Sequence, residues 1–522
     1  MKKWLNKNRF IILLFLITAI GALFRFYQLS DRLYFQLDEE RDWHMFRRSI
    51  VFHRPPLIGS YLPPGLYLGP LWVYVSALIG LLTNLNPFVY GTIASGLGVL
   101  AVPLIYIVGK QVFESRKIGL TASAIYSFSY LISIYSRVWW PLVFSPPATL
   151  IVYYGLWKIK QGHSGWSWPM FAALTLALHG EPPNLTTLIL IFTAVLIFKI
   201  NWKNRHFIGA ISMFLLSHAT LIIFEFKHQF VISKAFVQML TKLTSPVITE
   251  APVANVIPQI LYGFARIIYP SGKPDTVSQI GWCQEYLLER TLSIPMILLT
   301  ISALIIFLFI IISLLKFRYQ SFGNQLAAIH LIILISGLVF FSFVSGTPIY
   351  EWFFYHLFPI FSFIWAIALL KIHRIGRFWF WLVLPAILLT NFYTQIIAEN
   401  SHGLAKKNQA VQFALKQIPP DANFSIDSLG RCLAWSGYRT LFIQHGRVPA
   451  KSYLDELFGS WLYPTELTNK IAEWQIYFVD HEPYPFDDKT QEKYQQLKAS
   501  ANFSGRFGAI EVFVANQLPL WR

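Results

Sequence analysis

Charged residues are scarce in this chain: they make up 13% of its 522 residues, about half of the usual share in a soluble domain. Hydrophobic residues make up 55% and the mean hydropathy is +0.48, so the composition indicates a polytopic membrane protein. Cysteine is also rare, since only Cys283 and Cys432 are present, which excludes a disulfide scaffold and a thiolate metal cluster. The sequence lacks a P-loop and any glycine-rich phosphate loop, which argues against an ATP-driven pump and a nucleotide-sugar enzyme.

Acidic residues are the rarer kind of charge, 26 against 43 basic residues, and the net charge is +17. A basic excess of this size would suit nucleic acid, but the basic residues gather in short loops between apolar runs. Loops of this kind orient membrane spans by the positive-inside rule, so we discard a nucleic-acid partner. The clusters are Lys110/Arg116/Lys117, Lys158/Lys160, Lys199/Lys203/Arg205, Lys316/Arg318 and Lys371/Arg374/Arg377.

Twelve apolar runs approach the length of a membrane span, which is about 20 residues. They are 10–27, 66–82, 88–109, 118–136, 141–157, 166–179, 184–200, 207–224, 291–315, 325–345, 352–370 and 378–397. With a cytoplasmic N-terminus, all basic clusters lie inside only if the run 66–82 does not cross. Gly69-Pro70 interrupts this run, so we predict juxtamembrane or re-entrant helices within a first outer loop over 28–87. About eleven transmembrane helices and an outer C-terminus are therefore expected, in the plasma membrane.

The chain becomes polar near residue 398. We predict a transmembrane domain over 1–397 and a small extracytoplasmic α/β domain over 398–522, whose strand order and role stay open. A helical pattern and two strand-like runs lie at 404–417, Trp474–Val479 and Ala509–Ala515. Cys432 falls in this tail and Cys283 in a long outer loop over 225–290, so a disulfide and two separate thiols both remain open.

Four acids follow the first apolar run, within the stretch Tyr34-Phe-Gln-Leu-Asp38-Glu39-Glu40-Arg-Asp42. Ionisable groups beside a bilayer are costly unless they face water or a cavity, so a functional role is the default. The alternative is a solvated acidic loop that pairs with neighbouring arginines. Asp38 and Glu39 suit a general base and its partner: one carboxylate takes the proton of an attacking hydroxyl, and the other holds the acceptor or a metal.

Arg137 is the basic residue of the short outer loops, beside Trp140-Pro141. Its guanidinium would clamp a phosphate leaving group, and the alternative is an interfacial arginine that snorkels among aromatic residues. His179 and Glu181 end an unusually short apolar run, so both would line a recessed cavity. For His179 the alternative is a packing histidine.

Two further pairs complete the predicted substrate-binding set. Glu225 and His228 begin the long outer loop, where a solvated loop start is the alternative. Tyr350 and His356 flank an aromatic stretch that suits a sugar or lipid phosphate, and an aromatic interface girdle is the alternative. No cluster has a clear metal-ligand spacing, so a divalent cation at Asp38 and Glu39 stays open.

These motifs together resemble the first outer loop of the GT-C glycosyltransferases, in particular glycosyltransferase family 39. That family includes protein O-mannosyltransferases, and the aminoarabinose–lipid A transferases are related to it. The matching residues are Asp38-Glu39, Gly59–Pro64, Leu66–Trp72, Ser136-Arg137, Trp140-Pro141, His179, Phe224-Glu225 and His228. The chain departs from the family pattern where a second acid is often found near Trp140-Pro141, and where Leu62 replaces a histidine.

The resemblance implies a GT-C fold and a polyprenyl-phosphate sugar donor, used on the outer face with inversion at the anomeric carbon. It also implies Asp38 as general base and Glu39 as partner of the acceptor or a metal. We therefore expect a membrane hexosyl- or pentosyltransferase whose lipid donor lies between helices, so that no soluble cofactor is needed. A protein, a lipid and a cell-envelope glycan all stay open as extracytoplasmic acceptors. The alternatives are a lipid-linked saccharide flippase without covalent chemistry and a non-catalytic scaffold.

Overall fold

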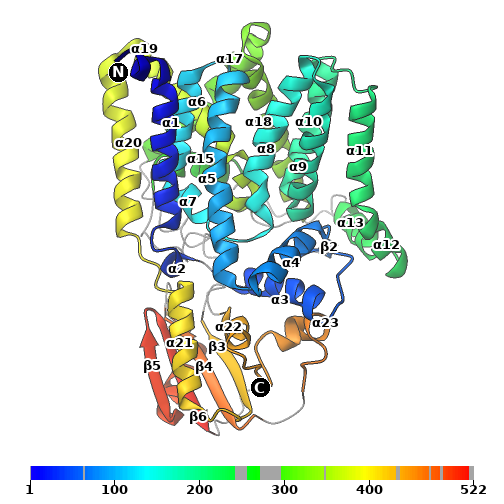
Figure 1. Ribbon diagram of the computed structural model, residues 1–522, viewed down its shortest axis with the longest axis vertical. Helices are drawn as coiled ribbons and strands as arrows, with labels where there is room; N and C mark the ends of the chain where they lie inside the picture. Colours follow the sequence, from blue (N-terminus) through cyan, green and yellow to red (C-terminus); the bar gives the residue numbers. More distant parts are fainter. Residues whose placement is uncertain are drawn as a thin grey trace.

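The computed structural model describes residues 2–33, 35–62, 65–241, 256–270, 296–345, 349–430, 436–468, 472–481 and 486–516. Long helices stand side by side in a bundle, and a smaller part with strands lies at one end of it (Figure 1). We call this smaller part, residues 398–516, the C-terminal unit. The residues that carry some of the expectations above lie outside the described ones: Tyr34, Pro63, Pro64, Cys283, Cys432 and parts of 225–290.

Six helices of the described part are long and apolar enough to cross a membrane. A helix rises about 1.5 Å per residue, so about 20 residues cover the hydrocarbon layer. They are α1 (Lys2–Phe26), α5 (Pro87–Gln111), α11 (Arg205–Ser217) continued by α12 (Ala219–Lys227), α18 (Phe322–Ser345), α19 (Phe358–Ile375) and α20 (Arg377–Ile397). The chain is therefore a multi-pass membrane protein, and the count of eleven spans stays a prediction.

Further helices complete the bundle. They are α6 (Arg116–Phe128), α7 (Tyr130–Tyr135), α8 (Ser145–Lys160), α9 (Ser167–Gly180), α10 (Leu185–Ile197), α15 (Val256–Arg266) and α17 (Met296–Leu315). Short turns of tighter helix precede α8, α10 and α19, at η1 (Pro141–Phe144), η3 (Pro182–Asn184) and η8 (Glu351–Leu357). Proline suits the first two starts, because its fixed φ fits a first helical turn and its missing N–H is not needed there.

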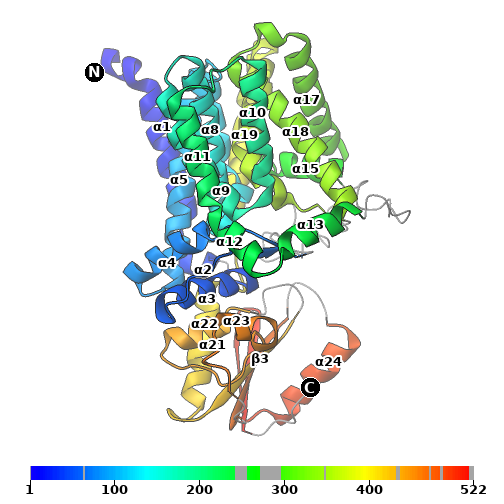
Figure 2. The ribbon, with the colours of Figure 1, turned by 90° about the vertical axis from the view of Figure 1, so that its right-hand side faces the viewer.

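The segment 66–82 lies across the end of the bundle. It contains part of a two-stranded hairpin and a short helix, β1 (Tyr61–Leu62), β2 (Leu66–Tyr67) and α4 (Leu71–Thr83). Helix α4 ends at Asn84, which adopts a left-handed φ of 50°. Its 13 residues cover about 20 Å, which is too short for the hydrocarbon layer. The helix packs on α3 (Leu37–Val51) between the helical bundle and the C-terminal unit (Figures 1 and 2), and this agrees with the predicted juxtamembrane helix.

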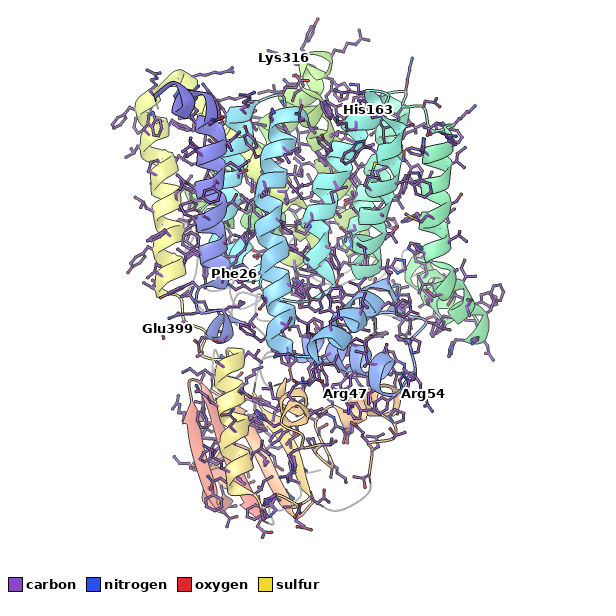
Figure 3. All side chains as sticks on the ribbon, in the orientation of Figure 1. Phe26, Arg47, Arg54, His163, Lys316 and Glu399 are labelled. Carbon is purple, nitrogen blue, oxygen red and sulfur yellow. The ribbon has the colours of Figure 1, made fainter. Side chains whose placement is uncertain are left out.

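Two of the predicted inner loops lie at the same end of the bundle. Figure 3 places Lys316 and His163 at the end where Figure 1 shows the N-terminus. Phe26 lies toward the other end, and Glu399 lies beyond it, where the C-terminal unit begins. The loops that carry Lys158/Lys160 and Lys316/Arg318 thus share one face with the N-terminus. Which face meets the cytoplasm remains a prediction of the positive-inside rule.

The C-terminal unit contains a four-stranded sheet of order β3-β4-β6-β5. β3 is parallel to β4, and the other two pairings are antiparallel. The strands are β3 (Phe424–Leu429), β4 (Trp474–Asp480), β5 (Phe503–Phe507) and β6 (Ile510–Asn516), with helices α21 (Leu404–Gln417), α22 (Tyr438–Gln444), α23 (Ser460–Leu462) and α24 (Asp488–Ser500). The predicted helix coincides with α21, and the strand-like runs with β4 and β6. The boundary at residue 398 stays a prediction.

Candidate functional site

Helix α3 carries all four acids of the stretch that follows the first span. It begins after Gln36, whose backbone N–H donates to Glu39 Oε2 at 3.1 Å and so fixes the first turn. Acids are favourable there because a helix N-terminus carries a partial positive charge. Glu39, Glu40 and Asp42 are buried, and only Asp38 is substantially exposed, at 41%. This burial rules out a solvated acidic loop.

Because α3 is helical, successive side chains point in different directions and have different surroundings. One face lines a cavity, a second contacts the C-terminal unit, and a third carries a cluster of charges. These faces consist of Glu39/Trp43/Phe46, Glu40/His44/Arg47 and Asp38/Arg41/Asp42, respectively. Neighbouring acids therefore have distinct chemical settings.

The small cavity beside α3 is partly open and has two charged side chains in its wall, Glu39 and Arg137. The other lining residues are largely aromatic or apolar: Leu33, Phe35, Trp43, Phe46, Pro87, Tyr90, Gly91, Trp139 and Leu404. Few polar groups set in an apolar, concave wall are typical of a ligand site. The structure thus brings together two of the residues that the sequence predicts, Glu39 and Arg137.

Glu39 forms the acidic wall of this cavity. Its Oε1 is buried and has no hydrogen-bond partner among the described residues. Burial raises the pKa of Glu39 well above its ordinary value of 4.5, although the bond from the Gln36 N–H opposes the shift. The shift is toward the protonated form of the carboxyl, and in that form Glu39 would donate a hydrogen bond to a ligand.

Arg137 forms the basic wall. It lies in the turn after α7, and its Nη2 donates to the Phe24 carbonyl at 2.5 Å and to Gln395 Oε1 at 3.3 Å. Arg25 and Arg32 lie near enough to repel its charge. All three guanidinium groups are buried. Within the described part of the chain, no carboxylate forms an ion pair with any of them.

Backbone and hydroxyl oxygens hold the two other arginines. Arg25 Nε donates to Ser136 Oγ at 3.0 Å, and its Nη1 donates to the Gly21 carbonyl at 3.0 Å. Arg32, at the end of α2 (Leu29–Arg32), donates to the Gln395 carbonyl at 2.6 Å. Carbonyls carry only partial charge, so the three buried cations are incompletely balanced, and an anion bound here would reduce the cost. The cluster is suited to a phosphate.

The sequence analysis missed Arg25 and Arg32. Arg25 lies inside the first apolar run, and an arginine within a span is rare and usually functional, so this signal was present. Arg32 gives no comparable signal, because its contact with Gln395 joins residues 363 positions apart.

A second polar cluster surrounds Asp38. Arg41 pairs with Asp38 and Asp42, each at 2.9 Å, and Ser60 Oγ donates to Asp42 Oδ1 at 3.2 Å. Glu181 lies close enough to interact with all three charged groups. Its burial, reinforced by the charges of Asp38 and Asp42, raises the pKa of Glu181 to about 8 against the attraction of Arg41. The structure therefore joins the end of α9 to the acids of α3.

We expect the Glu181→Gln variant to lose a pH-dependent part of the stability of the protein. The folded-state pKa of Glu181, about 8, exceeds its ordinary 4.5, so the folded protein binds this proton more tightly than the unfolded chain does. The free energy of unfolding should therefore fall, by up to about 1.4 kcal/mol per pH unit, as pH rises through this range. Thermal unfolding of both proteins in detergent at acid and alkaline pH checks this. Parallel pH curves for the two proteins would contradict it.

His179 anchors the hairpin and α4 to the bundle. Its Nδ1 accepts from the Leu71 N–H at 3.3 Å, its Nε2 lies 3.3 Å from Ser217 Oγ, and its ring lies 4.3 Å from the ring of His218. The residue does not line the cavity. Its contacts are those of a packing histidine.

A methyl group at Gly69 should loosen this anchor. A Cβ there would overlap the His179 ring, so Gly69→Ala would displace the ring and weaken its bond from the Leu71 N–H. We expect a loss of about 1–3 kcal/mol, typical of overpacking, seen as a lower midpoint of thermal unfolding. Gly96→Ala is the matched control, since a Cβ at Gly96 meets nothing within 4 Å. Equal midpoints for the two variants would refute the close packing.

Glu225 and His228 lie where α12 turns into α13 (Val231–Thr241). Glu225 accepts from the backbone N–H groups of Ile232 at 2.7 Å and Ser233 at 2.9 Å, and so caps α13. His228 stacks on Phe224 with ring centroids 4.2 Å apart. Neither of the two lines the cavity.

Tyr350 and His356 are buried elsewhere in the bundle. Tyr350 stacks on Trp352 at a centroid distance of 6.1 Å. His356 Nε2 lies 2.9 Å from Thr186 Oγ1, which also contacts His330 at 3.3 Å. Neither Tyr350 nor His356 lines the cavity.

Metal binding receives no geometric support in the part of the chain that the structure describes. No group of three or more His, Cys, Asp or Glu side chains there is arranged to hold a metal ion. The cation considered at Asp38 and Glu39 thus lacks a third protein ligand among these residues.

No family model and no curated protein matches this chain. Its structure is similar to crystal structures of ArnT from Cupriavidus metallidurans. The undecaprenyl phosphate complex has 13% identity and a TM-score of 0.51, over 98% of this chain and 100% of that one. The apo state has 12% identity and a TM-score of 0.51, over 97% of this chain and 99% of that one. The oligosaccharyltransferase AglB from Archaeoglobus fulgidus has 12% identity and a TM-score of 0.48, over 99% of this chain and 75% of that one. The predicted GT-C resemblance is confirmed at the level of the fold.

Proposed function

We propose that this protein transfers a sugar from a polyprenyl-phosphate donor to an acceptor on the outer side of the membrane. The observation that carries the proposal is the cavity beside α3, which has Glu39 and Arg137 in one wall of aromatic and apolar residues. A phosphate needs a cation, and a sugar needs hydrogen-bonding groups and aromatic surfaces. This cavity offers each of them at the end of a membrane-spanning bundle.

The phosphate of the donor fits the three-arginine cluster. Arg137 Nε and Arg32 Nε are buried and have no hydrogen-bond partner among the described residues. Guanidinium groups bind phosphate oxygens through such N–H groups, and the negative charge would offset the repulsion within the cluster. ArnT, which shares the fold, was solved with undecaprenyl phosphate bound. This supports a lipid phosphate as the ligand, with its tail between helices of the bundle.

The chemistry follows from the different settings of Asp38 and Glu39. The acceptor oxygen bonds to the anomeric carbon while the bond from that carbon to the phosphate oxygen breaks. The polyprenyl phosphate leaves with the electron pair of that bond, and the acceptor proton passes to the Asp38 carboxylate. Attack from the face opposite the leaving group inverts the configuration at the anomeric carbon.

Each residue has a role that suits its surroundings. Asp38 is partly exposed, so an acceptor can reach it, and Arg41 at 2.9 Å balances its charge. Burial raises the pKa of Glu39, and its protonated carboxyl would donate a hydrogen bond to the sugar or the phosphate. Arg137 would stabilise the negative charge that develops on the leaving phosphate. Asp38 does not line the cavity, but it adjoins Glu39 in the first turn of α3. His179, Glu225, His228, Tyr350 and His356 receive no role in this proposal, because they neither line the cavity nor belong to α3.

The proposal is tested with the purified protein, radiolabelled polyprenyl-phosphate sugars and a membrane extract. We expect label to move into the protein, lipid or glycan fraction, and the labelled fraction identifies the class of acceptor. If no donor supports transfer while the protein carries the lipid-linked saccharide across liposome membranes, a transporter replaces the transferase.

A further inference from the structure

The C-terminal unit forms hydrogen bonds with the same helix that carries the candidate catalytic acids, α3. Glu40 of α3 is fully buried at the contact between them. Its Oε1 accepts from the Thr440 N–H at 3.0 Å, and its Oε2 accepts from the Gly437 N–H at 2.7 Å and the Tyr453 hydroxyl at 2.8 Å. One carboxylate of α3 thus satisfies three donors of the C-terminal unit.

The backbone that leads into α3 is held from the same side. Lys407 Nζ donates to the carbonyl of Phe35 at 2.6 Å and to that of Ser436 at 2.6 Å. The Leu404 N–H donates to the Leu33 carbonyl at 3.1 Å. Leu33, Phe35 and Leu404 also line the cavity, so the C-terminal unit both supplies part of its wall and fixes another part.

The attachment continues toward the far end of α3. Arg47 Nη2 pairs with Glu466 at 2.6 Å, and Arg439 pairs with the same carboxylate at 3.1 Å. The His44 ring lies 5.0 Å from the ring of Tyr463. Glu40, His44 and Arg47 are spaced at i, i+4 and i+7, so one face of the helix is held against the C-terminal unit at every turn.

A helix held along one face cannot rotate without breaking these contacts, and its rotation decides where Asp38 and Glu39 point. Among the residues that the structure describes, the Glu39 carboxylate accepts one hydrogen bond, from the Gln36 N–H. Arg137, in contrast, lies in the turn after α7 and belongs to the bundle. A rotation of α3 would therefore move the acids and leave Arg137 in place.

We propose that Glu40 is a positioning residue for sugar transfer, and that the C-terminal unit belongs to the catalytic apparatus because it sets the rotation of α3. This inference rests on the proposed function. It assigns Glu40 an effect on turnover rather than on binding of the lipid phosphate.

Two variants and one control test the proposal in the full chain. Glu40→Gln keeps the shape of the side chain but replaces an acceptor oxygen by an NH2 group, which faces an N–H donor in either orientation of the amide. Tyr453→Phe leaves the carboxylate intact but removes one donor to Glu40 and the oxygen that accepts from the Tyr438 N–H at 2.9 Å. Tyr494→Phe is the matched control, since its hydroxyl donates to Glu511 at 2.9 Å within the C-terminal unit.

The readouts are kcat for sugar transfer and the Kd of radiolabelled undecaprenyl phosphate, measured for each variant that elutes as folded protein. Misplacement of a catalytic group by about 1 Å costs up to roughly 100-fold in rate. We expect Glu40→Gln to lower kcat roughly 10- to 100-fold, with Kd within about twofold of wild type. Tyr453→Phe should lower kcat roughly 3- to 10-fold, and Tyr494→Phe should match wild type.

Three results would overturn the inference. The first is a wild-type kcat in Tyr453→Phe and in folded Glu40→Gln. The second is a loss of lipid binding that parallels the loss of kcat, because that pattern indicates general disruption. In either case a transferring wild type leaves the proposed function standing. The third is a wild type that transfers no sugar, which removes the proposed function and this inference together. If Glu40→Gln does not fold, Tyr453→Phe decides.

Discussion

The Asp38→Asn variant should transfer sugar roughly 10²- to 10⁴-fold more slowly than the wild type, the usual contribution of a general base. An amide keeps the size of the side chain but cannot take the acceptor proton. Binding of polyprenyl phosphate should remain at the wild-type level, because the arginine cluster that would hold the phosphate lies outside α3. Initial rates with a labelled donor, together with equilibrium binding of undecaprenyl phosphate, measure the two effects separately.

Asp421→Asn is the matched control for this variant. Asp421 is an exposed aspartate of the C-terminal unit, and its loss should leave the rate unchanged. Transfer by Asp38→Asn at the rate of the control would show that Asp38 is not the base.

The Arg137→Gln variant should bind undecaprenyl phosphate roughly 10- to 100-fold more weakly. This loss corresponds to the net contribution of a hydrogen bond to a charged group, which is about 1.5–3 kcal/mol. Glutamine is uncharged and offers fewer donors than the guanidinium. The variant should stay folded, because it removes one of three buried positive charges that repel each other. Binding of radiolabelled lipid by the detergent-solubilised protein measures the effect.

Arg318→Gln is the corresponding control. Arg318 is exposed and follows Lys316, which Figure 3 places at the end of the bundle away from the C-terminal unit. Equal affinities of the Arg137→Gln and Arg318→Gln proteins for undecaprenyl phosphate would place the phosphate elsewhere.

Much of the helical architecture was predictable because a span must consist of about 20 apolar residues. The runs 10–27, 88–109 and 378–397 coincide with α1, α5 and α20. Gly69-Pro70 identified the segment that does not cross, since proline and glycine interrupt a regular span. The sheet order was not predictable, because the parallel pairing of β3 with β4 joins segments about fifty residues apart by backbone bonds that leave no local pattern.

The candidate site was predictable only where a charge stands out beside the membrane. Asp38, Glu39 and Arg137 were identified in this way, and the last two share the cavity. Glu40 was part of the same stretch, but its role in holding the C-terminal unit was not predictable. Its contact with Thr440 spans 400 positions, and no local sequence pattern indicates such a contact. Tyr350 and His356 lie outside this cavity, and the sequence does not distinguish their possible roles, because aromatic neighbours surround both packing residues and binding residues.

The most direct test of the account is an electron cryo-microscopy structure of the protein with bound undecaprenyl phosphate. The account predicts density for the phosphate in the cavity beside α3, within hydrogen-bonding distance of Arg137 and near Glu39. Phosphate density at another place, such as the His330–His356 cluster inside the bundle, would contradict it.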